Sequence, residues 1–105
     1  MSSRCQIRCE CRLTVIGPKR DVQRFQISAW EKRLQARYLD LVLFSAHRFV
    51  CQFETDSRDG RDLKRLQRLS RSHPGLVLLL DYERPRLKGL AKAKAGELEH
   101  CEIGY

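Results

Sequence analysis

The residues best suited to chemistry are three cysteines near the N-terminus. Cys5, Cys9 and Cys11 have the spacing C-x3-C-x-C. Thiolates at short spacing can bind zinc, but a structural zinc site needs four ligands, which usually come as two short pairs. No second pair of that kind follows, and free cysteine often serves as a small buried hydrophobic residue. We therefore predict no metal and no cofactor.

The chain has five cysteines, an odd number, and nothing in it indicates secretion. Reduced thiols in the cytoplasm are the simplest account of such cysteine usage. The opening residues lack the apolar segment of a signal peptide, and the longest apolar run, GLVLLL, is far shorter than the ~20 residues that span a bilayer. We therefore predict a cytoplasmic protein with no membrane contact.

Other catalytic combinations are weak. A nucleophilic cysteine needs a base within reach, and the three histidines, His47, His73 and His100, all fall in predicted turns or near chain ends. Asp81 and Glu83 share one face of a predicted strand, where ion pairing with arginine is the simpler interpretation. No phosphate-binding or dinucleotide-binding glycine pattern is present. The sequence therefore predicts that the protein is not an enzyme.

Basic residues give the clearest functional signal. Twenty-one Lys and Arg against thirteen Asp and Glu give a net charge of +8, which favours nucleic acid or another acidic partner. Two clusters could bind phosphate, one on a predicted helix and one on a predicted strand: Arg61, Lys64, Arg65, Arg68 and Arg71, and then Arg86, Lys88, Lys92 and Lys94. Ordinary solvation of these side chains is the alternative interpretation.

The periodicity of apolar residues predicts the elements that position these groups. Residues 7–17 alternate and predict a half-buried strand, which Gly17 and Pro18 end. Residues 19–35 predict one amphipathic helix, and residues 38–46 and 48–56 predict a hairpin. A second helix is expected within residues 56–73, where Ser57 or Asp59 could cap it. Strands are expected at residues 76–84 and 86–95.

This order predicts one domain over residues 1–105 with a ferredoxin-like β-α-β-β-α-β fold. Two helices should cover one face of an antiparallel sheet, each crossover being right-handed. The segment 86–95 should form an extra C-terminal strand at the sheet edge, with lysines on its outer side.

Three segments resemble the ferredoxin-like domain of YubB-type proteins, which are small bacterial proteins carried on plasmids, phages and genomic islands. They are CRLTVIGPKRDVQRF, FVCQFETDS, and the helix and strand LKRLQRLSRSHPGLVLLLDYE with the following KG and AKAGELEH. The WGTKW-like segment of that family is absent, and the single tryptophan is Trp30. The resemblance implies a fold and supplies no catalytic residue.

The sheet face without helices is predicted to be partly apolar. Strand alternation places six apolar residues on it: Val42, Phe44, Val50, Val77, Leu79 and Leu90. A patch of this kind could dock a second copy, as a homodimer, or another protein. The sequence thus predicts a non-enzymatic binding or interaction module, of the kind that serves as an accessory protein of a mobile element. The alternative is a nucleic-acid-binding domain that contacts phosphates through both basic clusters.

Overall fold

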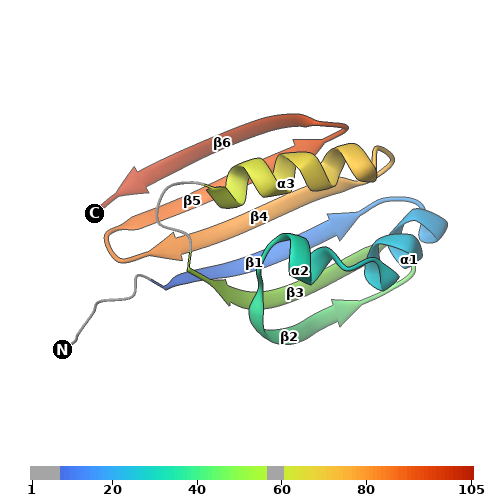
Figure 1. Ribbon diagram of the computed structural model, residues 1–105, viewed down its shortest axis with the longest axis horizontal. Coiled ribbons are helices and arrows are strands. Elements are labelled where there is room, and N and C mark those ends of the chain that lie inside the picture. Colours follow the sequence, from blue (N-terminus) through green and yellow to red (C-terminus); the bar gives the residue numbers. More distant parts are fainter. Residues whose placement is uncertain (1–7, 57–60) are drawn as a thin grey trace.

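The computed structural model describes residues 8–56 and 61–105, and within them the chain forms six strands and three helices (Figure 1). The strands are β1 (Cys9–Ile16), β2 (Arg37–Phe44), β3 (Arg48–Thr55), β4 (Val77–Arg84), β5 (Leu87–Lys94) and β6 (Glu97–Gly104). The helices are α1 (Lys19–Ile27), α2 (Trp30–Arg33) and α3 (Arg61–Ser72). The cap predicted at Ser57 or Asp59 lies outside the described residues.

The strands form a single antiparallel sheet in the order β2-β3-β1-β4-β5-β6. β1 is central: Leu13 lies opposite Cys51 of β3 on one side and Leu80 of β4 on the other. Every second residue of β1 is buried, from Cys9 to Val15, because the helices cover that face alone. We call this the helix side of the sheet and the opposite face the open side.

The predicted ferredoxin-like sandwich is wrong. It required two helices and a single extra strand, whereas the chain forms three short helices and a six-stranded antiparallel sheet. Two local features account for the difference. The first predicted helix ends early, at Ser28, and the residues Ala95 and Gly96 turn the chain back so that the C-terminal segment adds a sixth strand.

The break after α1 lets an aromatic cluster form. Ser28 has an extended backbone (φ −74°, ψ 160°), and its hydroxyl donates to the carbonyl oxygen of Phe25. The chain is thereby redirected: Ile27 is left 86% exposed while Trp30 is only 4% exposed. The Trp30 ring stacks on Phe25 at 5.7 Å between centroids and meets Phe49 of β3 edge-on. Burying Trp30 therefore decides against one continuous helix.

β5 is an internal strand, not the edge strand predicted from its lysines. Its helix side carries Leu87 and then three small residues, Gly89, Ala91 and Ala93, and α3 packs on this strand. The following turn is fixed to α3, because Gln67 donates to the carbonyl oxygen of Gly96 at 2.8 Å and the Gly96 amide donates to Ser70 at 2.9 Å. Both Ala95 (φ 51°) and Gly96 (φ 86°) have the left-handed backbone of a tight two-residue hairpin turn.

The absence of a side chain at Gly89 gives space to Tyr82. These two residues are directly opposite in the β4–β5 pair, and Gly89 in turn lies opposite Glu102 of β6. The Tyr82 ring lies over the glycine, since a Cβ there would come within 2.2 Å of the ring. Its hydroxyl donates to the Glu102 carboxylate at 2.6 Å. One side chain thus connects β4 to β6 across the strand between them.

β2 is an irregular edge strand, and this changes the predicted phase of the apolar patch. Its pairing with β3 shifts between Arg37 and Asp40 and again between Leu41 and Leu43. After the second shift, Leu43 lies opposite Val50 and Phe44 opposite Phe49, so Phe44 takes the helix side. The strict alternation that placed Phe44 with Val50 was therefore wrong.

Candidate functional site

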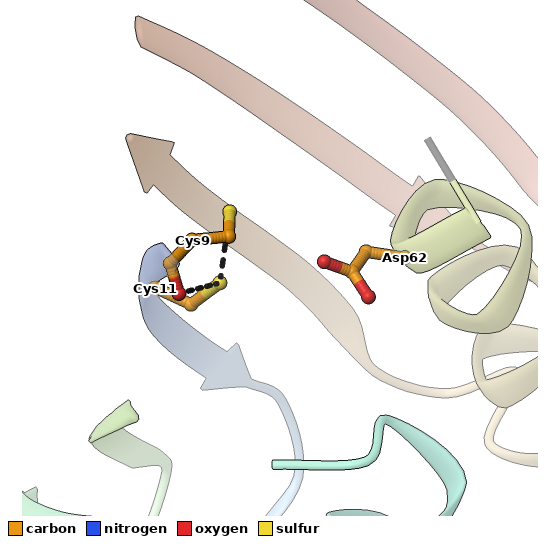
Figure 2. Close-up of side chains that lie close together, drawn as sticks. All are labelled: Cys9, Cys11 and Asp62. Carbon is orange, nitrogen blue, oxygen red and sulfur yellow. Dashed lines mark hydrogen bonds between the residues drawn. The ribbon is translucent and has the colours of Figure 1, made fainter. Parts of the chain in front are cut away.

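Two cysteines of β1 and an aspartate of α3 form a buried polar cluster (Figure 2). Cys9, Cys11 and Asp62 are 2%, 5% and 7% exposed, and their ligand atoms lie within 4.8 Å of one another. The two sulfur atoms are 3.7 Å apart. They lie on the same side because residues two apart on a strand share a face. Asp62 reaches them from the first turn of the helix that covers that face.

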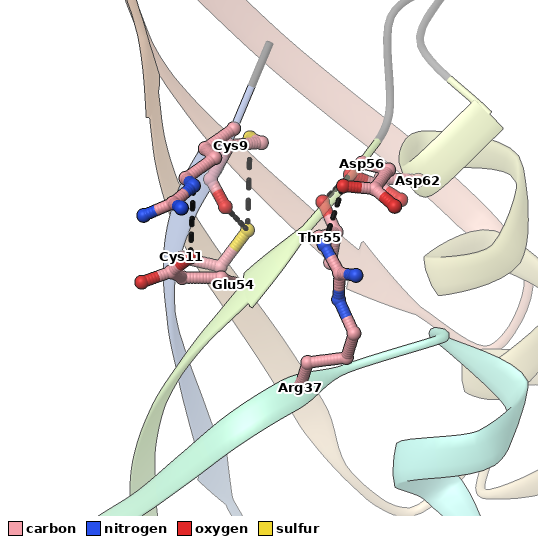
Figure 3. A network of polar contacts seen from close by, with 8 residues as sticks. Cys9, Cys11, Arg37, Glu54, Thr55, Asp56 and Asp62 are labelled. Atoms are coloured by element: carbon pink, nitrogen blue, oxygen red, sulfur yellow. Dashed lines mark hydrogen bonds and ion pairs between the residues drawn. The ribbon is translucent and has the colours of Figure 1, made fainter. Parts of the chain in front are cut away.

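Two neighbouring side chains fix the carboxylate of Asp62, and Figure 3 shows one of them, Thr55. The Thr55 hydroxyl at the end of β3 donates to Asp62 Oδ2 at 2.8 Å, and Arg65, one turn along α3, pairs with Oδ1 at 3.3 Å. The adjacent Asp56 is paired separately with Arg37 of β2. A carboxylate that is buried in this way is tolerated because both of its oxygens have partners.

The two thiols interact strongly with each other. The Cys11 thiol donates to the Cys9 sulfur, and this hydrogen bond lowers the pKa of Cys9. The same bond and burial together raise the pKa of Cys11 far above its ordinary value. The hydrogen bond therefore lowers the pKa of the first proton of the pair and raises the pKa of the second.

Sequence analysis found the two cysteines but missed Asp62. It treated both cysteines as core residues, and their burial agrees with that interpretation. The contact with Asp62 spans more than fifty residues, so no local spacing indicates it. The only available signal was an aspartate inside the first turn of an otherwise basic helix. Cys5 lies outside the described residues.

The three helices form a surface with one sign of charge. Nine of their ionisable side chains are exposed, and all nine are cationic: Lys19, Arg20, Arg24, Lys32, Arg33, Arg61, Lys64, Arg68 and Arg71. Their three acids, Asp21, Glu31 and Asp62, are buried or half-buried. The α2 and α3 ends of this surface meet where Arg33 donates to Ser72 at 2.9 Å. We call the nine exposed cations the basic helix surface.

The second predicted basic cluster lies on the other face of the sheet. Lys88, Lys92 and Lys94 of β5 alternate with the buried alanines and so point to the open side. Lys92 and Lys94 lie directly opposite Glu99 and Glu97 of β6, which compensates their charge locally. Arg86 is in the turn between β4 and β5. The structure therefore does not bring the two basic clusters together.

The open side of the sheet has a polar half and an apolar half. The polar half contains a depression of about 620 Å³, whose charged lining residues are Glu10, Arg12, Asp40, Glu54, Asp81, Glu83 and Lys88. The apolar half spans four strands: Leu43 of β2 lies opposite Val50 of β3, and Ile16 of β1 lies opposite Val77 of β4. Leu79 of β4 also belongs to it, but Thr14 of β1 lies between Leu79 and Val50. Of the other predicted patch residues, Val42 lies at the β2 irregularity, and Leu90 is 47% exposed on β5.

The histidines are separate from the cysteine pair in the described structure. His47 contacts the carbonyl oxygen of Gly17 at the end of β1, and His100 is exposed on β6. His73 is half-buried, with its ring edge-on to Phe25 at 5.1 Å, and burial lowers its pKa.

Comparisons with known proteins identify no relative. No family model, no curated protein and no solved structure matches the chain. Among the described residues, no helix is long and apolar enough to cross a membrane.

Proposed function

We propose that this chain is a non-enzymatic binding module that binds a nucleic-acid phosphate backbone through its basic helix surface. The observation that carries the proposal is the charge of the three helices, in which every exposed ionisable side chain is Lys or Arg. Phosphates attract such a surface without regard to base sequence.

The dimensions of the surface fit this partner. α3 has twelve residues and is therefore about 18 Å long, which corresponds to about five phosphates along one strand of a duplex. The contact between Arg33 and Ser72 continues the row of cations from α3 to α2. The helices expose no aromatic residue for stacking, because Phe25 and Trp30 are buried in the core. Contacts between these Lys and Arg side chains and the phosphates of the nucleic acid are therefore expected to supply most of the affinity.

The test compares two double variants that remove the same charge from opposite faces. Lys64→Gln/Arg68→Gln removes two exposed cations from α3, and Lys92→Gln/Lys94→Gln removes two from the open side. Fluorescence anisotropy with a labelled duplex would measure affinity between about 50 and 200 mM salt. The α3 variant should weaken binding similarly for unrelated sequences and flatten the slope of log K against log salt by about 2.

The β5 variant should behave like the wild-type chain. Equal losses from both variants would show only a response to net charge and would contradict a defined surface. Wild-type chain that binds neither DNA nor RNA at low salt would refute the function itself.

A second candidate function is self-association through the apolar half of the open side. The observation that favours it is the row of apolar residues on four strands, interrupted at Thr14 of β1, which no described helix covers. Two-fold stacking of two copies would cover both rows at once. Light scattering at high concentration tests this candidate: Ile16→Lys, at a position 37% exposed, should convert a dimer into a folded monomer. A monomeric wild-type chain would refute it.

A further inference from the structure

We propose that Cys9, Cys11 and Asp62 bind one thiophilic divalent cation, with zinc as the best fit. This inference is independent of the proposed phosphate-binding surface. It rests on three side chains of suitable chemistry that meet in the same buried place, from two elements far apart in the sequence. Thiolate ligands select soft or borderline cations such as zinc over magnesium and calcium.

The distance between the sulfur atoms fits a tetrahedral zinc ion. Zinc–sulfur bonds of about 2.3 Å that meet at a tetrahedral angle place two sulfurs about 3.8 Å apart. The Cys9 and Cys11 sulfurs are 3.7 Å apart. The Asp62 carboxylate is within 4.8 Å of both, so a small rotation of its side chain completes a third bond. The cysteines therefore need almost no rearrangement.

A disulfide fits the same two residues less well. Residues two apart on an extended strand have Cα atoms about 6.4–6.8 Å apart, which is the upper limit for a disulfide. Closing that bond would bend β1 where it pairs with both β3 and β4. A cation bridges the sulfurs without moving the backbone.

The surroundings of Asp62 suit a metal ligand. Thr55 and Arg65 each contact one carboxylate oxygen and so orient the carboxylate, as the outer partners of metal-bound carboxylates do. Binding releases the thiol protons to solvent, so two thiolates and a carboxylate bring three negative charges to a divalent ion. The nearby Arg65 guanidinium offsets the remaining charge. Three protein ligands leave a fourth position for water.

The absorption spectrum of bound Co²⁺ depends on its ligands and therefore tests the proposed ligands directly. The 105-residue chain, reduced and stripped of metal with a chelator, would be titrated with Co²⁺, and zinc would then displace the cobalt. We expect one equivalent per chain, tetrahedral d–d bands and a thiolate-to-cobalt charge-transfer band. Cys9→Ser and Cys11→Ser should each weaken binding at least tenfold. Cys51→Ser, at another buried cysteine on the helix side of the sheet, should bind like wild type.

Two further measurements keep the test decisive if a variant misfolds. X-ray absorption of the zinc-loaded wild-type chain should show two sulfur and two lighter neighbours. Asp62→Asn keeps an oxygen to accept from Thr55, and it should fold but bind cobalt more weakly. Absence of charge-transfer bands, a different sulfur count, or a dependence on Cys5 or Cys51 would overturn the assigned ligands.

Discussion

Replacing Gly89 with alanine tests whether Tyr82 connects three strands. In most strand interiors, alanine is more stable than glycine by about 0.5–1 kcal/mol, because glycine loses more conformational freedom on folding. Here the added Cβ would lie 2.2 Å from one ring carbon of Tyr82 and 2.4 Å from its hydroxyl oxygen. Real Cβ atoms do not approach so closely, so the ring must leave its position over β5.

The cost of moving the ring has two parts. Overpacking of a buried site costs about 1–3 kcal/mol, and the hydrogen bond to the charged Glu102 contributes about 1.5–3 kcal/mol. The second part takes the lower value, because the Glu102 side chain is 34% exposed and water can replace its lost partner. After subtracting the ordinary gain from alanine, we expect Gly89→Ala to lower the free energy of unfolding by about 2 kcal/mol.

Urea unfolding followed by circular dichroism would measure this change, with Gly104→Ala as the matched control. A Cβ at Gly104 meets only a backbone oxygen at 3.7 Å, so that variant should lose little stability. In a Tyr82→Ala background, Gly89→Ala should become neutral or stabilising. A second readout is the pKa of Tyr82, which burial and the hydrogen bond to Glu102 raise in the wild-type chain and which should fall in Gly89→Ala. If Gly89→Ala stabilises the wild-type chain, the reasoning is refuted.

Two further predictions concern the turns and the pH dependence of stability. Arg86 has a left-handed backbone (φ 67°) in the β4–β5 turn, which strains a residue with a side chain. Arg86→Gly should therefore raise the free energy of unfolding by up to about 1 kcal/mol, measured as a higher urea midpoint. An unchanged midpoint would contradict this strain. His73 has a pKa below that of the unfolded chain because burial and Arg33 disfavour its charged form, Asp21 opposing them. The unfolded chain therefore binds more protons below about pH 6.5, so stability should fall as the pH drops from about 7.5 to 5.5. His73→Gln should reduce that fall, and identical pH profiles would count against it.

Local sequence patterns predicted most of the elements but not their assembly. The alternation in residues 7–17 identified β1, and the leucine spacing identified α3, because each pattern reports directly which face is buried. The first helix was predicted too long, since the packing of Trp30 on Phe25 and Phe49 is a tertiary effect. The local helix propensity around Ser28 is too small to outweigh the burial of these three aromatic rings.

The C-terminal segment shows why lysines alone misidentified an edge. Residues 97–104 include three acids, Glu97, Glu99 and Glu102, and their strand character depends on pairing with β5. Glu97 and Glu99 complement Lys94 and Lys92 only once the turn at Gly96 brings the two strands together. The position of Asp62 beside the cysteines was equally hidden, because it depends on where α3 lies over the sheet.

The central position of β1 has a consequence for how the chain can fold. The strands β4, β5 and β6 are joined by two-residue turns and can pair as they emerge, as can β2 with β3. In the sheet, the β2–β3 unit and the β4–β5–β6 unit are joined only by β1, which pairs with both. β1 comes first in the chain, but it can complete its pairing only after both units have formed. The slow event should therefore be insertion of β1 between them. The amide protons of Leu13 and Val15, completely buried between both halves, should be among the last in the chain to exchange with solvent.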